Sequence, residues 1–108
     1  MTGGFIVDEF LLLYRLPARH ENDDTEVAAW NEWLSSLGDD LTDPGRPVID
    51  GEVAGRASTG LRLAGYSTVR AEDLAAARDV AGGCPALAAG GAVEVGRLVD
   101  MPEGHGPE

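Results

Sequence analysis

The chain has 108 residues, of which 44% are hydrophobic, and these values fit one small domain with a single core. Its formal net charge is −11, and all eight of its cationic residues are arginines. Nucleic acids and anionic membrane surfaces are bound through basic patches, so we expect neither as a partner. The lack of lysine also excludes catalysis through a lysine Schiff base.

Cys84 is the single cysteine, which leaves no intrachain disulfide and no thiolate metal cluster. The chain has no apolar run long enough to cross a membrane, and its N-terminus lacks the basic and apolar regions of a secretory signal. We therefore expect a cytoplasmic protein that uses no cofactor. Residues 1–8 and 102–108 are expected to be flexible ends around a domain at 9–101.

The run Glu9 to Leu16 is continuously apolar and predicts a strand. Phe10, Leu12 and Tyr14 point to one face of that strand, and the residues between them point to the other. Because both faces are apolar, both should be covered. We expect helices on one face and a second subunit on the other.

A helix is predicted after this strand. Asp23 followed by Glu26 has the spacing of a capping box, and apolar residues continue at helical spacing to about Leu37. Trp30 and Trp33 lie on or beside this apolar stripe. We therefore interpret both tryptophans as core residues rather than as a ligand cage.

The second half of the chain begins with a polar segment at 39–59, in which we expect one short strand near Pro47–Val53. A strand at 61–70, a helix ending at the Gly82-Gly83 pair and a strand at 92–99 follow. Pro85 is expected to prevent the helix from resuming. The resulting β-α-β-β-α-β order predicts an α+β, ferredoxin-like fold.

Three segments have a recognisable pattern: the strand Phe10–Arg15, the run from Ala29 to Pro47, and residues 65–101, in which Gly-Cys-Pro precedes Gly-Gly-x-Val-Glu-Val. Together they resemble the YCII-related family. The resemblance implies a ferredoxin-like protomer whose sheet pairs with a second one, giving a homodimeric α+β barrel. Most members have no assigned activity, and similar folds host isomerases, lyases and cofactor-free oxygenases. The Asp-Gly-Pro-Phe signature of many members is absent here.

His20 is the first candidate catalytic residue, because it follows the first strand and lies close in sequence to Asp23 and Asp24. A histidine that acts as a general base needs a carboxylate to fix its tautomer, and either aspartate could supply one. The alternative is a solvated loop histidine. Some relatives of the family pair a histidine with an aspartate as a proposed catalytic dyad.

Glu94 is the second candidate, since a carboxylate in mid-strand must face water, an opposite charge or a cavity. We expect Tyr14, Tyr66 and Glu94 to share one sheet face, with Arg15 or Arg62 at its edge. Buried in a dimeric barrel, Glu94 could move a proton while the tyrosines and Arg15 bind substrate. The alternative is a salt bridge from Glu94 to an arginine at a dimer interface.

Two further features carry weaker signals. Cys84 lies after a helix and before a proline, so we interpret it as a small buried hydrophobe. The run Asp39-Asp-Leu-Thr-Asp43 has the spacing of a magnesium site, but Gly38 and Pro44 bracket it and exclude the helix that such a site needs. Two functions therefore remain open. One is a cofactor-independent isomerase or lyase acting on a small-molecule ligand, and the other is a non-catalytic dimeric binding or regulatory module.

Overall fold

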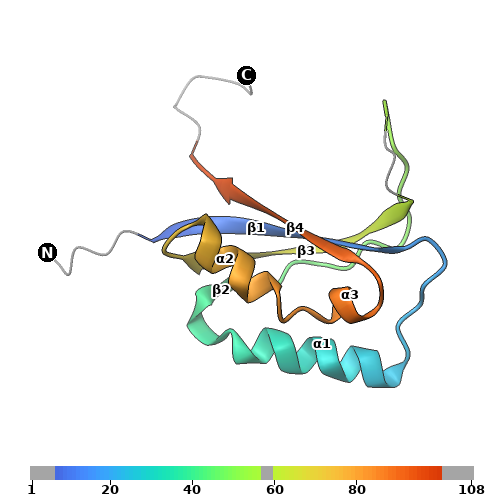
Figure 1. Cartoon of the computed structure of the whole chain (residues 1–108), viewed down its shortest axis with the longest axis horizontal. Helices are drawn as coiled ribbons and strands as arrows, with labels where there is room; N and C mark the ends of the chain where they lie inside the picture. The colour runs from blue at the N-terminus through green and yellow to red at the C-terminus, as the bar shows by residue number, and fades with distance from the viewer. Residues whose placement is uncertain (1–6, 57–59, 101–108) are drawn as a thin grey trace, which may run out of the picture.

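The computed structural model describes residues 7–56 and 60–100. Its four-stranded antiparallel sheet has the order β2-β3-β1-β4, which is the ferredoxin-like arrangement that the sequence predicts. Figure 1 shows all three α-helices on the same side of this sheet. The bounds are β1 Asp8–Pro17, α1 Asp24–Ser36, β2 Leu41–Asp43, β3 Leu61–Ala71, α2 Leu74–Ala81, α3 Pro85–Ala88 and β4 Ala92–Leu98, with a 3₁₀ turn η1 at Gly38–Asp40.

The predicted flexible ends lie largely outside the described residues. Residues 1–6 and 101–108 are not among them, and Asp8 already belongs to β1. No helix in the described part of the chain is long and apolar enough to cross a membrane.

The core lies between the central strand and the helices. Every second residue of β1 from Phe10 to Leu16 is buried, and these side chains point toward α2 and α3 as the predicted alternation requires. Ala77, Ala81 and Ala86 bring the two short helices close to the sheet, since their small side chains permit close approach. Trp30 and Trp33 pack against this core from α1, as predicted.

The start of α1 confirms the predicted capping box. The Asp23 carboxylate accepts a hydrogen bond from the Glu26 amide at 2.8 Å, and the Glu26 carboxylate accepts one from the Asp23 amide at 3.0 Å. The helix ends at Ser36, and Gly38 follows with a φ of +57°. A glycine accepts this left-handed conformation without the strain that a side chain would add.

The short second strand lies at Leu41–Asp43, so its predicted position near Pro47–Val53 is wrong. Leu41 pairs with Val69 at the edge of the core, whereas Ile49 and Val53 are 85% and 63% exposed and have no sheet to join. Of the predicted strand, only an isolated bridge from Pro47 to Gly65 remains. A proline there cannot donate a ladder hydrogen bond.

Pro85 starts a helix rather than preventing one, which corrects a second expectation. It occupies the first turn of α3, with Cys84 as the N-cap residue. A proline is accommodated at this position because its missing N–H would have no intrahelical partner, and its fixed φ is already helical.

Within the part of the chain that the structure describes, no helix lies on the second face of the sheet (Figure 1). Leu11 and Leu13 of β1 lie on this face and are only half-buried, and Leu63 of β3 is 38% exposed. This surface, called the open face below, is therefore apolar at its centre.

Candidate functional site

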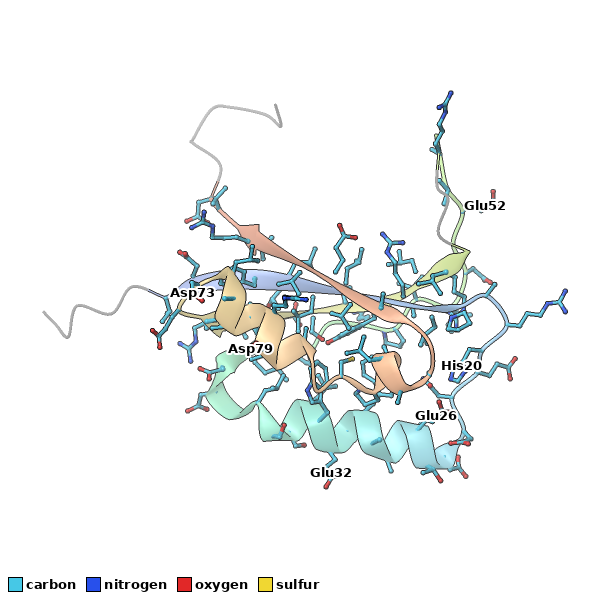
Figure 2. The ribbon with its side chains drawn as sticks, viewed as in Figure 1. His20, Glu26, Glu32, Glu52, Asp73 and Asp79 are labelled. Atoms are coloured by element: carbon cyan, nitrogen blue, oxygen red, sulfur yellow. The ribbon has the colours of Figure 1, made fainter. Side chains whose placement is uncertain are left out.

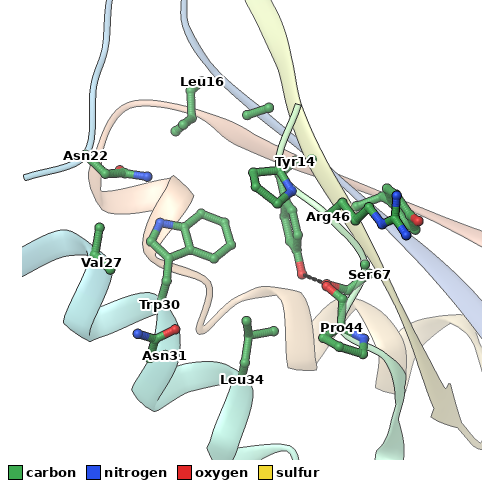
Figure 3. Close-up of a pocket in the computed structure, with 15 residues that line it drawn as sticks. Tyr14, Leu16, Asn22, Val27, Trp30, Asn31, Leu34, Pro44, Arg46 and Ser67 are labelled. Carbon is green, nitrogen blue, oxygen red and sulfur yellow. Dashed lines mark hydrogen bonds between the residues drawn. The ribbon is translucent and has the colours of Figure 1, made fainter. Parts of the chain in front are cut away.

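Two adjoining cavities lie at the end of the sheet where β1 leaves the core and α1 begins. The first, of about 330 Å³, lies between α1, the segment 44–47 and the sheet (Figure 3). The second, of about 400 Å³, lies beside it and is lined by the turn at 18–22 and by residues 47–49. Leu16, Asn22, Pro47 and Ala64 line both cavities, so the two lie side by side.

A β-bulge and two glycines shape these cavities. The register between β1 and β3 shifts after Tyr14, which pairs with Gly65, and Ala64 is left without a partner on β1. Gly65 has a φ of +156°, and an added Cβ would lie 2.9 Å from the Arg46 carbonyl oxygen. At Gly45, with a φ of +71°, a Cβ would overlap the Tyr66 carbonyl. Backbone therefore packs directly on backbone here, which fixes the segment 44–47 as a wall of the first cavity, and Pro47 also lines the second.

The first cavity has mostly apolar walls and one buried hydrogen-bonded chain. The Tyr14 hydroxyl donates to Ser67 Oγ at 2.8 Å, and Ser67 donates to the Pro44 carbonyl at 2.7 Å (Figure 3). The Trp30 ring stands edge-on to Tyr14, with 4.7 Å between the ring centroids. Burial raises the pKa of Tyr14 to about 12, although the hydrogen bond to Ser67 opposes this shift. Tyr14 is therefore a neutral phenol at physiological pH and cannot act as a base.

The second cavity is bordered by His20, which pairs with a carboxylate of α1. His20 Nε2 lies 2.8 Å from Glu26 Oε2 and 3.3 Å from Asn22 Oδ1, and Figure 2 shows His20 and Glu26 next to each other. Both oxygens act as acceptors, so Nε2 carries the proton and Nδ1 is the nitrogen able to accept another. The His20 amide also donates to the Pro17 carbonyl at 2.9 Å, which fixes the turn after β1.

The expected pairing of His20 with Asp23 or Asp24 is wrong, because the partner is Glu26. Asp23 is the N-cap residue of α1, and Asp24 is exposed as the first residue of the helix. Glu26 uses one carboxylate oxygen for the helix cap and the other for the imidazole. The capping box could have identified it, since that motif directs the Glu26 side chain back toward the residues before the helix.

The expected common face for Tyr14, Tyr66 and Glu94 is also wrong. Tyr14 faces the helices, whereas Tyr66 and Glu94 both pair with Leu13 and lie on the open face. The prediction failed because the register pairs Tyr14 with Gly65, and a shift of one residue moves a side chain to the other face.

Glu94 and Arg15 form an ion pair on the open face. Arg15 Nη2 lies 3.4 Å from Glu94 Oε1, and the two side chains are 31% and 68% exposed. An ion pair to an arginine was the structural alternative for Glu94, and here it forms within one chain. A pair this exposed contributes little to stability.

Arg62, like Arg19, is a cationic side chain that lines the cavity bordered by His20. Its Nη2 donates to the His20 carbonyl oxygen at 3.1 Å, its Nη1 lies 3.5 Å from the Val48 carbonyl oxygen, and its side chain lines the second cavity. From the sequence we predicted only that Arg62 lies at the edge of a sheet face, without a contact to His20. Its position beside His20 depends on the pairing of β3 with the end of β1, where Leu16 lies opposite Arg62.

The weaker candidates take no part in this site. Cys84 is 3% exposed, and burial raises the pKa of its thiol to about 11, so the predicted reading as a buried hydrophobe is confirmed. Asp39 and Asp40 lie in η1 and Asp43 ends β2. The described residues contain no group of three or more histidine, cysteine or acidic side chains placed to hold a metal ion.

An antiparallel sheet in the order β2-β3-β1-β4, with helices on one face, defines a small α+β protein of the ferredoxin-like class. In this protein a histidine also borders a cavity. Within that class, the family model of the YCII-related domain matches residues 9–102, and the chain belongs to this family. Comparisons with curated proteins and with solved structures returned no match.

Proposed function

We propose that this protein is a cofactor-independent enzyme that transfers a proton on a small molecule, as an isomerase or lyase, with His20 as the acid/base group. The observation that carries the proposal is the 2.8 Å contact between His20 Nε2 and Glu26 Oε2 beside a cavity. Glu26 is held by the helix cap, so the imidazole is oriented before any ligand arrives. A histidine oriented by a fixed carboxylate is a common arrangement of general bases.

In the proposed reaction, His20 Nδ1 removes a proton from a carbon next to a carbonyl group, and Glu26 stabilises the imidazolium that forms. The same nitrogen returns the proton to another carbon or to a leaving group. Asn22 lines both cavities, and its Oδ1 faces His20, so its amide NH₂ group remains to donate to a developing enolate oxygen. The Tyr14 hydroxyl is already bonded to Ser67, and we assign Tyr14 to the cavity wall.

Proton transfer of this kind is tested by deuterium exchange. A panel of carbon acids is incubated with the protein in D₂O, and loss of C–H signals is followed by proton NMR. His20→Gln should lower the exchange rate by about 10²–10⁴-fold, which is the usual contribution of a general base. Asp24→Asn is the matched control, because Asp24 is near His20 in sequence but is not its partner, and it should leave the rate unchanged. Exchange that survives His20→Gln at the wild-type rate refutes the proposal.

We also propose that a second copy of the chain covers the open face, giving a homodimer. The half-buried Leu11 and Leu13 at the centre of that face support this, since a sheet face apolar at its centre is normally covered. Leu13→Arg should convert the dimer to a monomer in light scattering, whereas Leu87→Arg, at an exposed position on a helix of the other face, should not. A monomeric wild-type protein contradicts this proposal.

A homodimer is also compatible with the alternative function, in which the protein is a non-catalytic binding or regulatory module. In that case the deuterium exchange of every carbon acid in the panel would equal the rate without protein, while Leu13→Arg would still dissociate the dimer. The two experiments together therefore separate the enzyme from the module.

A further inference from the structure

We propose that the ligand of this site is a small carboxylic acid, whose carboxylate binds Arg62 and whose apolar body fills the cavity between α1 and the sheet. The inference deepens the proposed function and rests on it for the chemical step alone. The binding mode follows from the charge and the shape of the two adjoining cavities.

Arg62 has a positive charge that no carboxylate neutralises within residues 7–56 and 60–100. Its contacts in that part of the chain are two carbonyl oxygens, of His20 and Val48. Arg15 and Arg97 each pair with a carboxylate. Arg19 and Arg46 also line the cavities and form no ion pair within the described residues, but only Arg62 has a guanidinium that the backbone holds beside His20. A guanidinium has five N–H donors, so Arg62 retains donors for a further acceptor. A guanidinium without a carboxylate partner on a cavity wall favours an anionic ligand that binds it directly, and this contact must outweigh the repulsion from Glu21, which lines the same cavity.

The two carbonyl contacts also hold the guanidinium in place. Arg62 and His20 both line the second cavity, and the bond from Nη2 to the His20 carbonyl oxygen holds the guanidinium against the backbone of that residue. A carboxylate bound to Arg62 would place its neighbouring carbon atoms near His20. For the proposed proton transfer the ligand must also carry a carbonyl group, because a carboxylate alone leaves its neighbouring C–H bonds only weakly acidic.

The first cavity accounts for the rest of the ligand. At about 330 Å³ it lies at the small end of the range of about 300–1,000 Å³ for ligand pockets. Its walls include Val27, Trp30 and Leu34 of α1, and Figure 3 shows these side chains directed toward the sheet. An apolar or aromatic group gains by burial against such walls. Because Leu16 and Ala64 line both cavities, we place the carboxylate of the ligand in the second cavity and its apolar group in the neighbouring first one.

Binding is tested with phenylacetate, cinnamate and hexanoate as probes, and with phenylacetamide as the neutral counterpart of phenylacetate. Trp30 lines the first cavity, so its fluorescence reports occupancy. We expect saturable binding of at least one acid, weakened 10-fold or more by Arg62→Gln and less by Arg62→Lys. Arg70→Gln is the matched control, because Arg70 also donates to a backbone carbonyl, that of Asp39, and lines neither cavity. Phenylacetamide should bind wild type at least 10-fold more weakly than phenylacetate does.

Three results would overturn the inference. The first is that none of the three acids binds saturably, and the second is that wild type and folded Arg62→Gln bind the acid equally well. The third is that inorganic phosphate, at the same concentration as the acid, fully displaces it, which would indicate an anion site without an apolar part. If Arg62→Gln fails to fold, Val27→Phe provides the second test, since filling the first cavity should weaken cinnamate 10-fold or more. Unchanged cinnamate affinity in a folded Val27→Phe protein contradicts the binding mode.

The outcomes also separate this inference from the proposed function. Equilibrium binding of the acids should persist in His20→Gln, because the imidazole is needed for proton transfer rather than for the carboxylate. Binding that depends on Arg62, together with exchange that does not depend on His20, would retain the ligand class and refute the enzyme. Exchange that depends on His20 but not on Arg62 would retain the enzyme and refute the ligand class.

Discussion

The buried chain from Tyr14 through Ser67 to the Pro44 carbonyl predicts an asymmetry between two single substitutions. Ser67 is fully buried and takes part in both hydrogen bonds of the chain, whereas Tyr14 takes part in one. Ser67→Ala therefore leaves the Tyr14 hydroxyl, in a residue only 5% exposed, without its acceptor. Tyr14→Phe leaves the bond from Ser67 to Pro44 intact.

The magnitudes follow from these contacts. A buried donor without a partner costs about 1–3 kcal/mol, and a lost hydrogen bond whose groups are removed or satisfied elsewhere costs about 0.5–1.5 kcal/mol. We expect Ser67→Ala to lower the free energy of unfolding by the larger amount and Tyr14→Phe by the smaller. A difference of about 1 kcal/mol corresponds to about 4–8 °C in Tm for a domain of this size.

Urea unfolding followed by tryptophan fluorescence measures these free energies. The double variant should lose less stability than the two single losses added together, because both substitutions remove the same bond. Ser36→Ala is the control, since Ser36 is exposed and donates only to a carbonyl of its own helix, and it should change stability by less than about 0.5 kcal/mol. A Tyr14→Phe protein less stable than Ser67→Ala, or strictly additive losses, would refute the reasoning.

The remaining predictions concern pH, the helix cap and the tight turn. Because the pKa of Tyr14 is raised to about 12 by burial, the stability from its neutral hydroxyl is complete below pH 10 and is lost between about pH 10 and 12. Urea titrations of Tyr14→Phe should show a weaker loss in that window. Glu26→Gln keeps the helix cap but removes the charge, so the deuterium-exchange rate should fall while stability is unchanged. Glu26→Ala removes the cap as well, so urea titration should also show a free energy of unfolding lower by about 0.5–2 kcal/mol. Gly45→Ala should lower Tm by several degrees because its Cβ would overlap a carbonyl, whereas Gly51→Ala, with open space around it, should not.

Local patterns predicted the elements on which the site is built. The continuous apolar run Glu9 to Leu16 predicted the strand, and the face that each residue occupies followed because side chains of a strand alternate strictly. The spacing of Asp23 and Glu26 located the start of α1, since the capping box satisfies amides within a few residues of each other. These features depend on neighbours in the sequence and need no tertiary contact.

Weak or ambiguous local signals account for the errors in the second half of the chain. Residues 39–59 contain two stretches that could form a strand, Leu41–Asp43 and Pro47–Val53. Only Leu41–Asp43 pairs with β3 as a strand. Pro85 can either stop a helix or begin one, and the space beside Ala86, which is fully buried, decided in favour of α3.

The amino-acid sequence by itself determined the order of the elements, the helix cap, the two faces of β1 and the excess of negative charge. Only the tertiary structure decided which side chains meet. The register of β1 and β3 pairs Tyr14 with Gly65, which separates Tyr14 from Tyr66. The bulge after Tyr14 then pairs Leu16 with Arg62, beside the turn that carries His20. Register and long-range contacts depend on backbone pairing between segments tens of residues apart, and a pattern read along one segment contains no information about that pairing.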